Sequence, residues 1–106
     1  MEEVSIMVRH VVVFKMKKSA MGKSASDNAK ELASRFQEIS GRIDEVIACE
    51  TGMNYNGEKQ FYELCLNQTF ESRQALADYL VHPLHLVVRE HVLQVIDHRI
   101  VVDYDL

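Results

Sequence analysis

The sequence predicts an α+β fold of the ferredoxin-like βαββαβ type, in which a four-stranded antiparallel sheet carries its helices on one face. Three observations predict this fold. Segments rich in β-branched residues alternate with segments of helical periodicity in the order strand, helix, strand, strand, helix, strand. A single proline divides the second helical segment into two. The length of 106 residues fits one domain, so we assign residues 1–106 to a single domain.

The first strand is predicted over Val8–Lys17, a run dominated by valine and followed by a polar stretch of Ser, Gly and Lys. Strand alternation places one set of its side chains on a single face: His10, Val12, Phe14 and Met16. His10 therefore shares a face with large apolar residues.

The first helix is predicted to begin at Ser24, because Ser24 and Asp27 have the spacing of a capping box. Its apolar residues recur with a helical period: Ala29, Leu32, Ala33, Phe36 and Ile39. Gly41 marks the end of this helix, since glycine commonly follows the last helical residue.

Two segments, Glu45–Met53 and Gln60–Phe70, predict a β-hairpin with the turn pair Asn56-Gly57 between them. A loop centred on Gly57 would make Cys49 and Cys65 cross-strand neighbours. Direct cross-strand pairs match the geometry of a disulfide poorly, and we expect a reducing compartment. Both thiols are therefore expected to stay reduced.

The rest of the chain predicts two helices and a last strand. Ser72 is a good N-cap for a helix whose apolar residues are Ala75, Leu76, Tyr79 and Leu80. The pair His82-Pro83 closes that helix and opens the next, because proline disfavours helical geometry at the preceding residue and suits a first helical turn. The next helix carries an apolar stripe of Leu84, Val87, Val88, His91, Val92 and Val95. The last strand spans His98–Tyr104.

One face of the predicted sheet is left without a cover. Right-handed crossovers place all the helices on the same face. The other face would carry an apolar strip among polar side chains: Val11, Val13 and Cys65 among Arg9, Lys15 and Asn67. A second copy of the chain is the simplest cover for such a strip, so we predict a homodimer through the open sheet face.

Charge and hydropathy exclude several classes of partner. The formal net charge of -4 provides no basic surface for nucleic acid. The apolar run Val11–Phe14 is far shorter than the roughly 18 residues that span a bilayer. The acidic start Met1-Glu2-Glu3 differs from the basic start of a secretory signal. We therefore expect a cytoplasmic protein without a nucleic-acid or membrane partner.

No pattern in the chain predicts a metal ion or a cofactor. The sequence has no Cys-x-x-Cys motif, and His82 and His85 have no carboxylate or thiol at a ligand spacing within their segment. It also has neither a glycine-rich phosphate loop nor a Gly-x-Ser-x-Gly motif. We therefore expect neither a metal nor a cofactor.

The segment best suited to chemistry is Tyr79-Leu80-Val81-His82-Pro83-Leu84-His85. His85 lies in the first turn of the third helix, where the helix dipole disfavours the imidazolium and favours a neutral base. Tyr79 could approach His85 across the break as an acid–base pair. In the alternative interpretation, Tyr79 and His10 are core residues with satisfied hydrogen bonds and His85 is a helix-start residue bonded to backbone.

Four pieces of the chain, in this order, resemble the stress-responsive A/B barrel (Dabb) family. They are Val8–Lys17, Thr69-Phe70-Glu71-Ser72 with Ala75-Leu76, Tyr79-x-x-His82-Pro83-x-His85, and Val101-Val102-Asp103-Tyr104. The resemblance spans nearly the whole chain. It implies a ferredoxin-like fold whose sheets pair across a two-fold axis into a dimeric α+β barrel.

The resemblance also implies candidate site residues. Some members of the family look structural, whereas one plant polyketide cyclase performs intramolecular aldol chemistry without a cofactor. Its acid–base histidine and tyrosine correspond here to His85 and Tyr79, and its first-strand pocket histidine to His10. A third-strand pocket position that is histidine in the cyclase falls on Leu64.

Two hypotheses of function follow. In the first, the protein is a homodimeric scaffold or a binder of a small apolar ligand, and its activity is uncertain. In the second, it is a cofactor-independent enzyme of cyclase or lyase type. His85, Tyr79 and His10 would then act in a pocket of roughly 300 Å³ or more, walled by Val12, Phe14, Leu64 and Leu66. The sequence favours the first hypothesis, since it shows no substrate.

Overall fold

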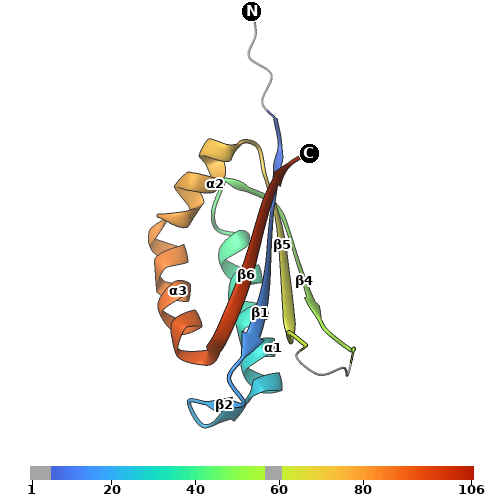
Figure 1. Cartoon of the computed structure of the whole chain (residues 1–106). Coiled ribbons are helices and arrows are strands. Elements are labelled where there is room, and N and C mark those ends of the chain that lie inside the picture. Colours follow the sequence, from blue (N-terminus) through green and yellow to red (C-terminus); the bar gives the residue numbers. More distant parts are fainter. Residues whose placement is uncertain (1–5, 57–60) are drawn as a thin grey trace, which may run out of the picture.

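Four long strands form one antiparallel sheet, and three helices pack on a single face of it (Figure 1). The computed structural model describes residues 6–56 and 61–106. The strands are β1 (Val8–Met16), β4 (Val46–Met53), β5 (Leu64–Phe70) and β6 (Ile96–Asp105), and the helices are α1 (Ala25–Ser40), α2 (Arg73–Leu80) and α3 (Pro83–Val95). A short hairpin, β2 (Ser19–Ala20) and β3 (Lys23–Ser24), precedes α1. The predicted fold is confirmed.

The order of the strands in the sheet is β4-β5-β1-β6, and each neighbouring pair is antiparallel. The crossover through α1 joins β1 to β4 and passes over β5. The crossover through α2 and α3 joins β5 to β6 and passes over β1. This is the ferredoxin-like arrangement, and both crossovers cover the same face of the sheet (Figure 1).

The core lies between this face and the helices. Alternate residues of β1 are buried, as the sequence predicts, and Phe14 stacks on Phe36 of α1 with ring centroids 5.7 Å apart. From α3, Val88, Val92 and Val95 pack into the same core. Full burial of an apolar side chain contributes about 1.5–3 kcal/mol, so this layer supplies most of the stabilisation.

Side chains cap the start of each helix. Ser24 Oγ accepts a hydrogen bond from the Asp27 amide at 3.1 Å, and Ser72 Oγ accepts one from the Ala75 amide at 3.0 Å. Both predicted N-caps are confirmed. His82 caps α3 in the same way, because its Nδ1 accepts from the Leu84 amide at 3.1 Å.

The hairpin between β4 and β5 differs from the prediction. Gly57 and Gln60 lie outside the described residues, and β5 begins at Leu64, later than expected. The stretch 61–63 is not strand. The Glu63 carboxylate accepts instead from the Met16 amide at 2.7 Å, and the Glu63 carbonyl accepts from the Asn54 amide at 2.9 Å.

The prediction that Cys49 and Cys65 are cross-strand neighbours is wrong. Cys49 lies opposite Gln68, and Cys65 lies opposite Gly52. The register is three residues away from the one that a loop centred on Gly57 would give. Both cysteines are free, as expected.

Smaller differences occur near the C-terminus. Strand β6 begins at Ile96, directly after the last residue of α3, so it is longer than predicted. Val87, predicted in the buried stripe of α3, is 65% exposed. Val88, His91, Val92 and Val95 form the buried face, and Val87 lies beyond its edge.

The open face of the sheet carries more apolar surface than the sequence alone indicated. Val11 and Val13 are half-buried there, and their β6 partners across the ladder are Val102 and Ile100. Ile100 is 44% exposed and Val102 52% exposed. All the described helices lie on the other face (Figure 1). In the described part of the chain, no helix combines the length and apolar character needed to span a membrane.

Candidate functional site

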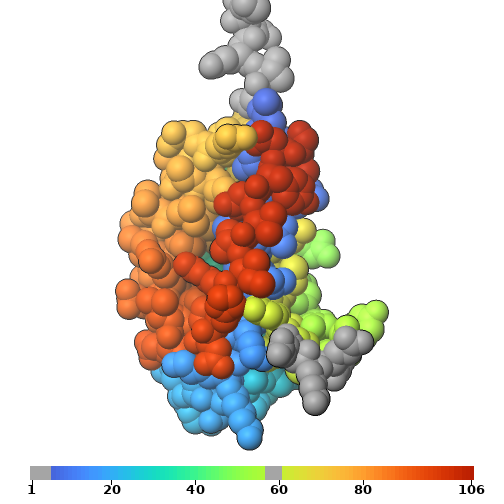
Figure 2. All heavy atoms as spheres, in the orientation of Figure 1, coloured from blue at the N-terminus to red at the C-terminus, as the bar shows by residue number. Residues whose placement is uncertain are grey.

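A pocket of about 250 Å³ opens between the sheet and the helices, somewhat smaller than the roughly 300 Å³ expected. Its apolar lining comes from the sheet, α1 and α2: Val12, Phe14, Leu66, Val101, Phe36 and Leu80. Its polar lining consists of His10, His85, Arg89, Arg99 and Asp103. The space-filling view shows a small hollow on this side of the molecule, between α3 in orange and β6 in red (Figure 2).

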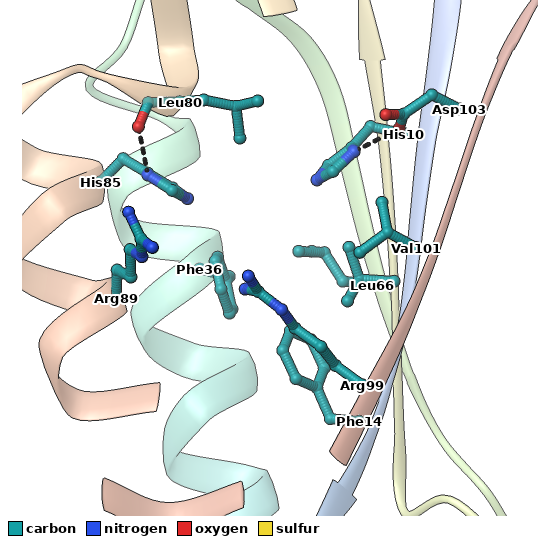
Figure 3. A pocket seen from close by; sticks show the side chains of 11 residues that line it. His10, Phe14, Phe36, Leu66, Leu80, His85, Arg89, Arg99, Val101 and Asp103 are labelled. Carbon is teal, nitrogen blue, oxygen red and sulfur yellow. Dashed lines mark hydrogen bonds and ion pairs between the residues drawn. The ribbon is translucent and has the colours of Figure 1, made fainter. Parts of the chain in front are cut away.

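His85 reaches the pocket from the first turn of α3. Its Nδ1 lies 3.0 Å from the carbonyl oxygen of Leu80, the last residue of α2. Since a carbonyl can only accept, Nδ1 carries the proton and Nε2 is left as an acceptor on the pocket side (Figure 3). The break at His82-Pro83 makes this contact possible, because it returns the chain so that α3 begins beside the end of α2.

Burial lowers the pKa of His85 below its ordinary value of 6.5. The hydrogen bond with Leu80 opposes this effect, whereas the nearby charges of His10, Arg89 and Arg99 reinforce it. His85 is therefore neutral at pH 7, and its Nε2 can accept a proton from a bound molecule. The sequence predicts a neutral His85 from the helix dipole, and in the structure burial is the main cause of the lowered pKa.

His10 faces the same pocket from β1 and is 6% exposed. Its Nδ1 lies 2.5 Å from a carboxylate oxygen of Asp103, which stands directly opposite His10 on β6. The carboxylate accepts from Nδ1, so Nε2 of His10 is turned toward the cavity and toward the helices (Figure 3). The place of Asp103 in the pocket could not be predicted from the sequence, because it depends on the register between β1 and β6.

Tyr79 lies beside the pocket but does not line it. Its side chain is fully buried, and its ring packs against those of Phe70 at 5.1 Å and His85 at 4.6 Å between centroids. The hydroxyl oxygen accepts a hydrogen bond from Gln68 Nε2 at 3.0 Å. Burial raises the pKa of Tyr79 to about 12. The structure thus places Tyr79 behind His85, as a ring that supports the imidazole.

The other expected wall residues divide into two groups. Val12, Phe14 and Leu66 line the pocket. Leu64 is 1% exposed and lies in the core as the first residue of β5, outside the pocket lining.

Sequence reasoning missed the two arginines of the pocket. Arg89 lies four residues after His85 on α3, a spacing that places both side chains on one helix face. Arg99 alternates with Val101 and Asp103 along β6, so all three share a face of the sheet. These spacings are the signal that could have identified them.

The described residues contain no group of three or more His, Cys, Asp or Glu side chains arranged to hold a metal ion. The polar groups of the pocket are two imidazoles, two guanidinium groups and one carboxylate. Such a set can bind a polar group of a small molecule and exchange protons with it.

Comparison with known proteins agrees with the fold. Residues 8–106 match the stress responsive A/B barrel domain family. The chain belongs to this family. The family predicted from the sequence is thereby confirmed. A stress-response A/B barrel domain-containing protein of Arabidopsis thaliana, HS1, is 28% identical over 98% of this chain and 94% of its own length.

Solved structures show the same fold at lower sequence identity. A dimeric ferredoxin-like protein of unknown function from Thermobifida fusca has a TM-score of 0.81 at 14% identity, covering 100% of this chain and 96% of its own. A hydroxynitrile lyase from Passiflora edulis has a TM-score of 0.80 at 13% identity, covering 94% and 93%. These likenesses show the fold of the stress-responsive A/B barrel domain and nothing about its ligand.

Proposed function

We propose that this protein is a homodimer that binds a small molecule in the pocket between His10 and His85. The observation that carries the proposal is the pocket itself, which combines an apolar lining with convergent polar groups. A site that served only to close the helix packing would have no reason to keep a cavity of about 250 Å³ beside two histidines.

The open sheet face supports the homodimer. Half-exposed Ile100, Val102 and Tyr104 extend the apolar strip of β1 across β6. Contiguous apolar surface of this kind is normally covered by a partner, and a two-fold axis lets one strip cover its copy. The neighbour from Thermobifida fusca, which has the same fold, is a dimeric protein. We place the protein in the cytoplasm, which agrees with its two free cysteines.

Ligand binding is tested by NMR titration of the labelled protein with a library of small organic fragments. We expect amide shifts to cluster on β1, β6 and the start of α3. Val101→Phe fills the pocket from β6 and should abolish these shifts, whereas Val87→Phe, on the exposed side of α3, should leave them unchanged. Fragments that shift amides elsewhere, or that cause the same shifts in the Val101→Phe variant as in the wild type, would contradict the proposal.

A second candidate function is cofactor-independent acid–base catalysis, as in a lyase or cyclase. One specific observation favours it: each imidazole is fixed at Nδ1 by an acceptor, Leu80 for His85 and Asp103 for His10, so both Nε2 atoms face the cavity. Neutral His85 would remove a proton from carbon through Nε2, and His10, when Nε2 as well as Nδ1 carries a proton opposite the Asp103 carboxylate, would donate a hydrogen bond to the carbonyl oxygen of the substrate. Such assistance contributes on the order of 10²–10⁴ in rate.

The catalytic candidate is tested with pocket ligands that carry an acidic carbon–hydrogen bond, incubated in deuterated water. We expect the wild type to exchange that hydrogen for deuterium. His85→Gln should slow the exchange about 100-fold while leaving the melting temperature within about 2 °C of the wild type. Equal exchange by both proteins would exclude His85 as the base.

A further inference from the structure

We propose that the pocket ligand is a small carboxylate with an apolar body, whose carboxylate is held by Arg89 and Arg99. This inference rests on the proposed binding function and adds the chemical class of the ligand.

The two arginines approach the cavity from opposite elements. Arg89 extends from α3 beside His85, and Arg99 extends from β6 above Phe14 (Figure 3). Both guanidinium groups point into the space between the helices and the sheet (Figure 3). Their charges both act on His85, which agrees with this placement.

Within the described residues, neither arginine has an ion-pair partner. Among residues 6–56 and 61–106, no carboxylate lies within 4.0 Å of the guanidinium nitrogens of Arg89 or Arg99. Three other arginines do have such partners: Arg35 with Glu31, Arg42 with Glu38 and Arg73 with Asp105. Arg9 on β1 also lacks such a partner among the described residues, but it does not line this pocket. The distinguishing feature of the cavity is that two unpaired arginines line it together.

The charges that line the cavity do not cancel. Asp103 is the carboxylate of the lining, and its oxygen is bonded to His10 rather than to an arginine. Two guanidinium groups therefore face one carboxylate that is already engaged. The pocket thus favours an anionic group near the arginines, and a planar guanidinium matches a carboxylate with two parallel hydrogen bonds.

The deeper lining determines the rest of the ligand. Phe14, Phe36 and Leu66 are buried side chains that form an apolar part of the lining. The volume of about 250 Å³ corresponds to about eight waters at roughly 30 Å³ each. This is the size class of an arylacetic acid or a short fatty acid. Inorganic phosphate would leave the apolar part unfilled.

The test is calorimetric titration at low salt and pH 7.5 with matched pairs of acid and amide: phenylacetate with phenylacetamide, and hexanoate with hexanamide. Inorganic phosphate is the third probe. We expect at least one acid to bind tenfold or more tightly than its amide, and tenfold or more tightly than phosphate. Raising the salt to 0.5 M should reduce this preference.

Charge removal at the two arginines should eliminate the preference. In the Arg89→Gln, Arg99→Gln double variant, the acid is expected to lose tenfold or more in affinity while the amide changes less than twofold. Arg42→Gln removes a paired surface arginine and should change neither affinity. The Arg99→Lys variant keeps the charge but loses the planar guanidinium, so its acid affinity should lie between those of the wild type and the double variant.

The outcomes separate this inference from the proposed function. Equal binding of acid and amide to the wild type would overturn the carboxylate class and leave ligand binding standing. If phosphate bound the wild type as tightly as the acids, the inference that the ligand has an apolar body would be wrong. Failure of every acid and amide to bind the wild type would overturn both proposals. Unchanged acid affinity in the double variant would show that the arginines are not the anion site.

Discussion

At the scale of single residues, the two pocket histidines present equivalent atoms although their partners differ. His85 Nδ1 donates to a neutral carbonyl of the chain, and His10 Nδ1 donates to the Asp103 carboxylate. Both rings therefore direct Nδ1 away from the cavity and turn Nε2 inward (Figure 3). The orientation of each ring is set by one acceptor, so each can be tested by one substitution.

The free energy of unfolding is expected to decrease as the pH is lowered, and part of this decrease is expected to come from His85. Burial lowers the pKa of His85 in the folded protein below its unfolded value of about 6.5, so the unfolded state binds the proton more readily. This contribution to stability is complete above the unfolded pKa and is lost as the pH falls through the folded pKa. Urea unfolding between pH 7.5 and 4.5 should show a steeper loss for the wild type than for His85→Gln. Parallel curves would contradict the assigned burial effect.

The Tyr79→Phe variant tests whether Tyr79 only supports the His85 ring or also contacts the ligand through its hydroxyl. The change removes the acceptor of the Gln68 hydrogen bond and leaves the ring contact with His85. We expect a loss of about 0.5–1.5 kcal/mol in the free energy of unfolding and no change in ligand affinity. Ser40 still accepts from Gln68 Nε2 at 3.0 Å, which limits the loss. A large loss of ligand affinity would show that the hydroxyl reaches the ligand.

At the scale of elements, the break between α2 and α3 builds the site. Pro83 stands at the first position of α3, and His82 caps it through the Leu84 amide. Leu80 can then end α2 within hydrogen-bond distance of His85. Two helices in place of one continuous helix thus give His85 its acceptor.

Ser72→Ala tests how far α2 depends on its cap. Removal of Ser72 Oγ leaves the Ala75 amide without its 3.0 Å acceptor, and we expect unfolding to become easier by about 1 kcal/mol. Ser26→Ala, at an exposed position of α1, is the matched control and should change the free energy of unfolding by less than about 0.5 kcal/mol. Chemical denaturation followed by circular dichroism measures both. Equal losses in the two variants would argue against the cap.

The elements themselves could be predicted from the sequence because their signals are local. Hydrophobic periodicity predicts every long strand and helix, and residue type and spacing predict the Ser24 and Ser72 caps. The pairing of Cys49 could not be predicted, since the register of a hairpin depends on the length and shape of its loop. The β2–β3 hairpin was also missed: its turn uses positive φ at Met21 and Gly22, and a Met at such a position gives no turn signal.

The site was predictable only in part, because local patterns define some of its residues and contacts between strands define the others. His10, Val12 and Phe14 follow from the alternation of one strand and were identified. Alternation along β6 puts Arg99 and Asp103 on one face, but their positions opposite Phe14 and His10 depend on the register between β1 and β6, which the sequence pattern does not report. Tyr79 has the correct spacing for an acid–base partner, but its hydroxyl points to Gln68, and sequence spacing does not report that direction.

At the scale of the whole molecule, the sheet has one covered and one open face, and the apolar strip on the open face is expected to form the dimer. Val11→Glu combined with Val102→Glu places charge on paired positions of β1 and β6. We expect light scattering to give twice the chain mass for the wild type and the mass of one chain for this variant. Val87→Glu, exposed on α3, should remain dimeric. A monomeric wild type would refute the assembly.

The direct junction of α3 and β6 has a geometric consequence for the arginines. Val95 ends α3 and Ile96 begins β6, so no loop residue lies between them, and the two elements diverge from this corner (Figure 1). Arg89 lies on α3, six residues before Val95, and Arg99 lies on β6, three residues after Ile96. The opening angle of one covalent corner therefore sets the span between two positive charges. Among related chains, insertions at this corner should vary with the length of the acid that each one accepts.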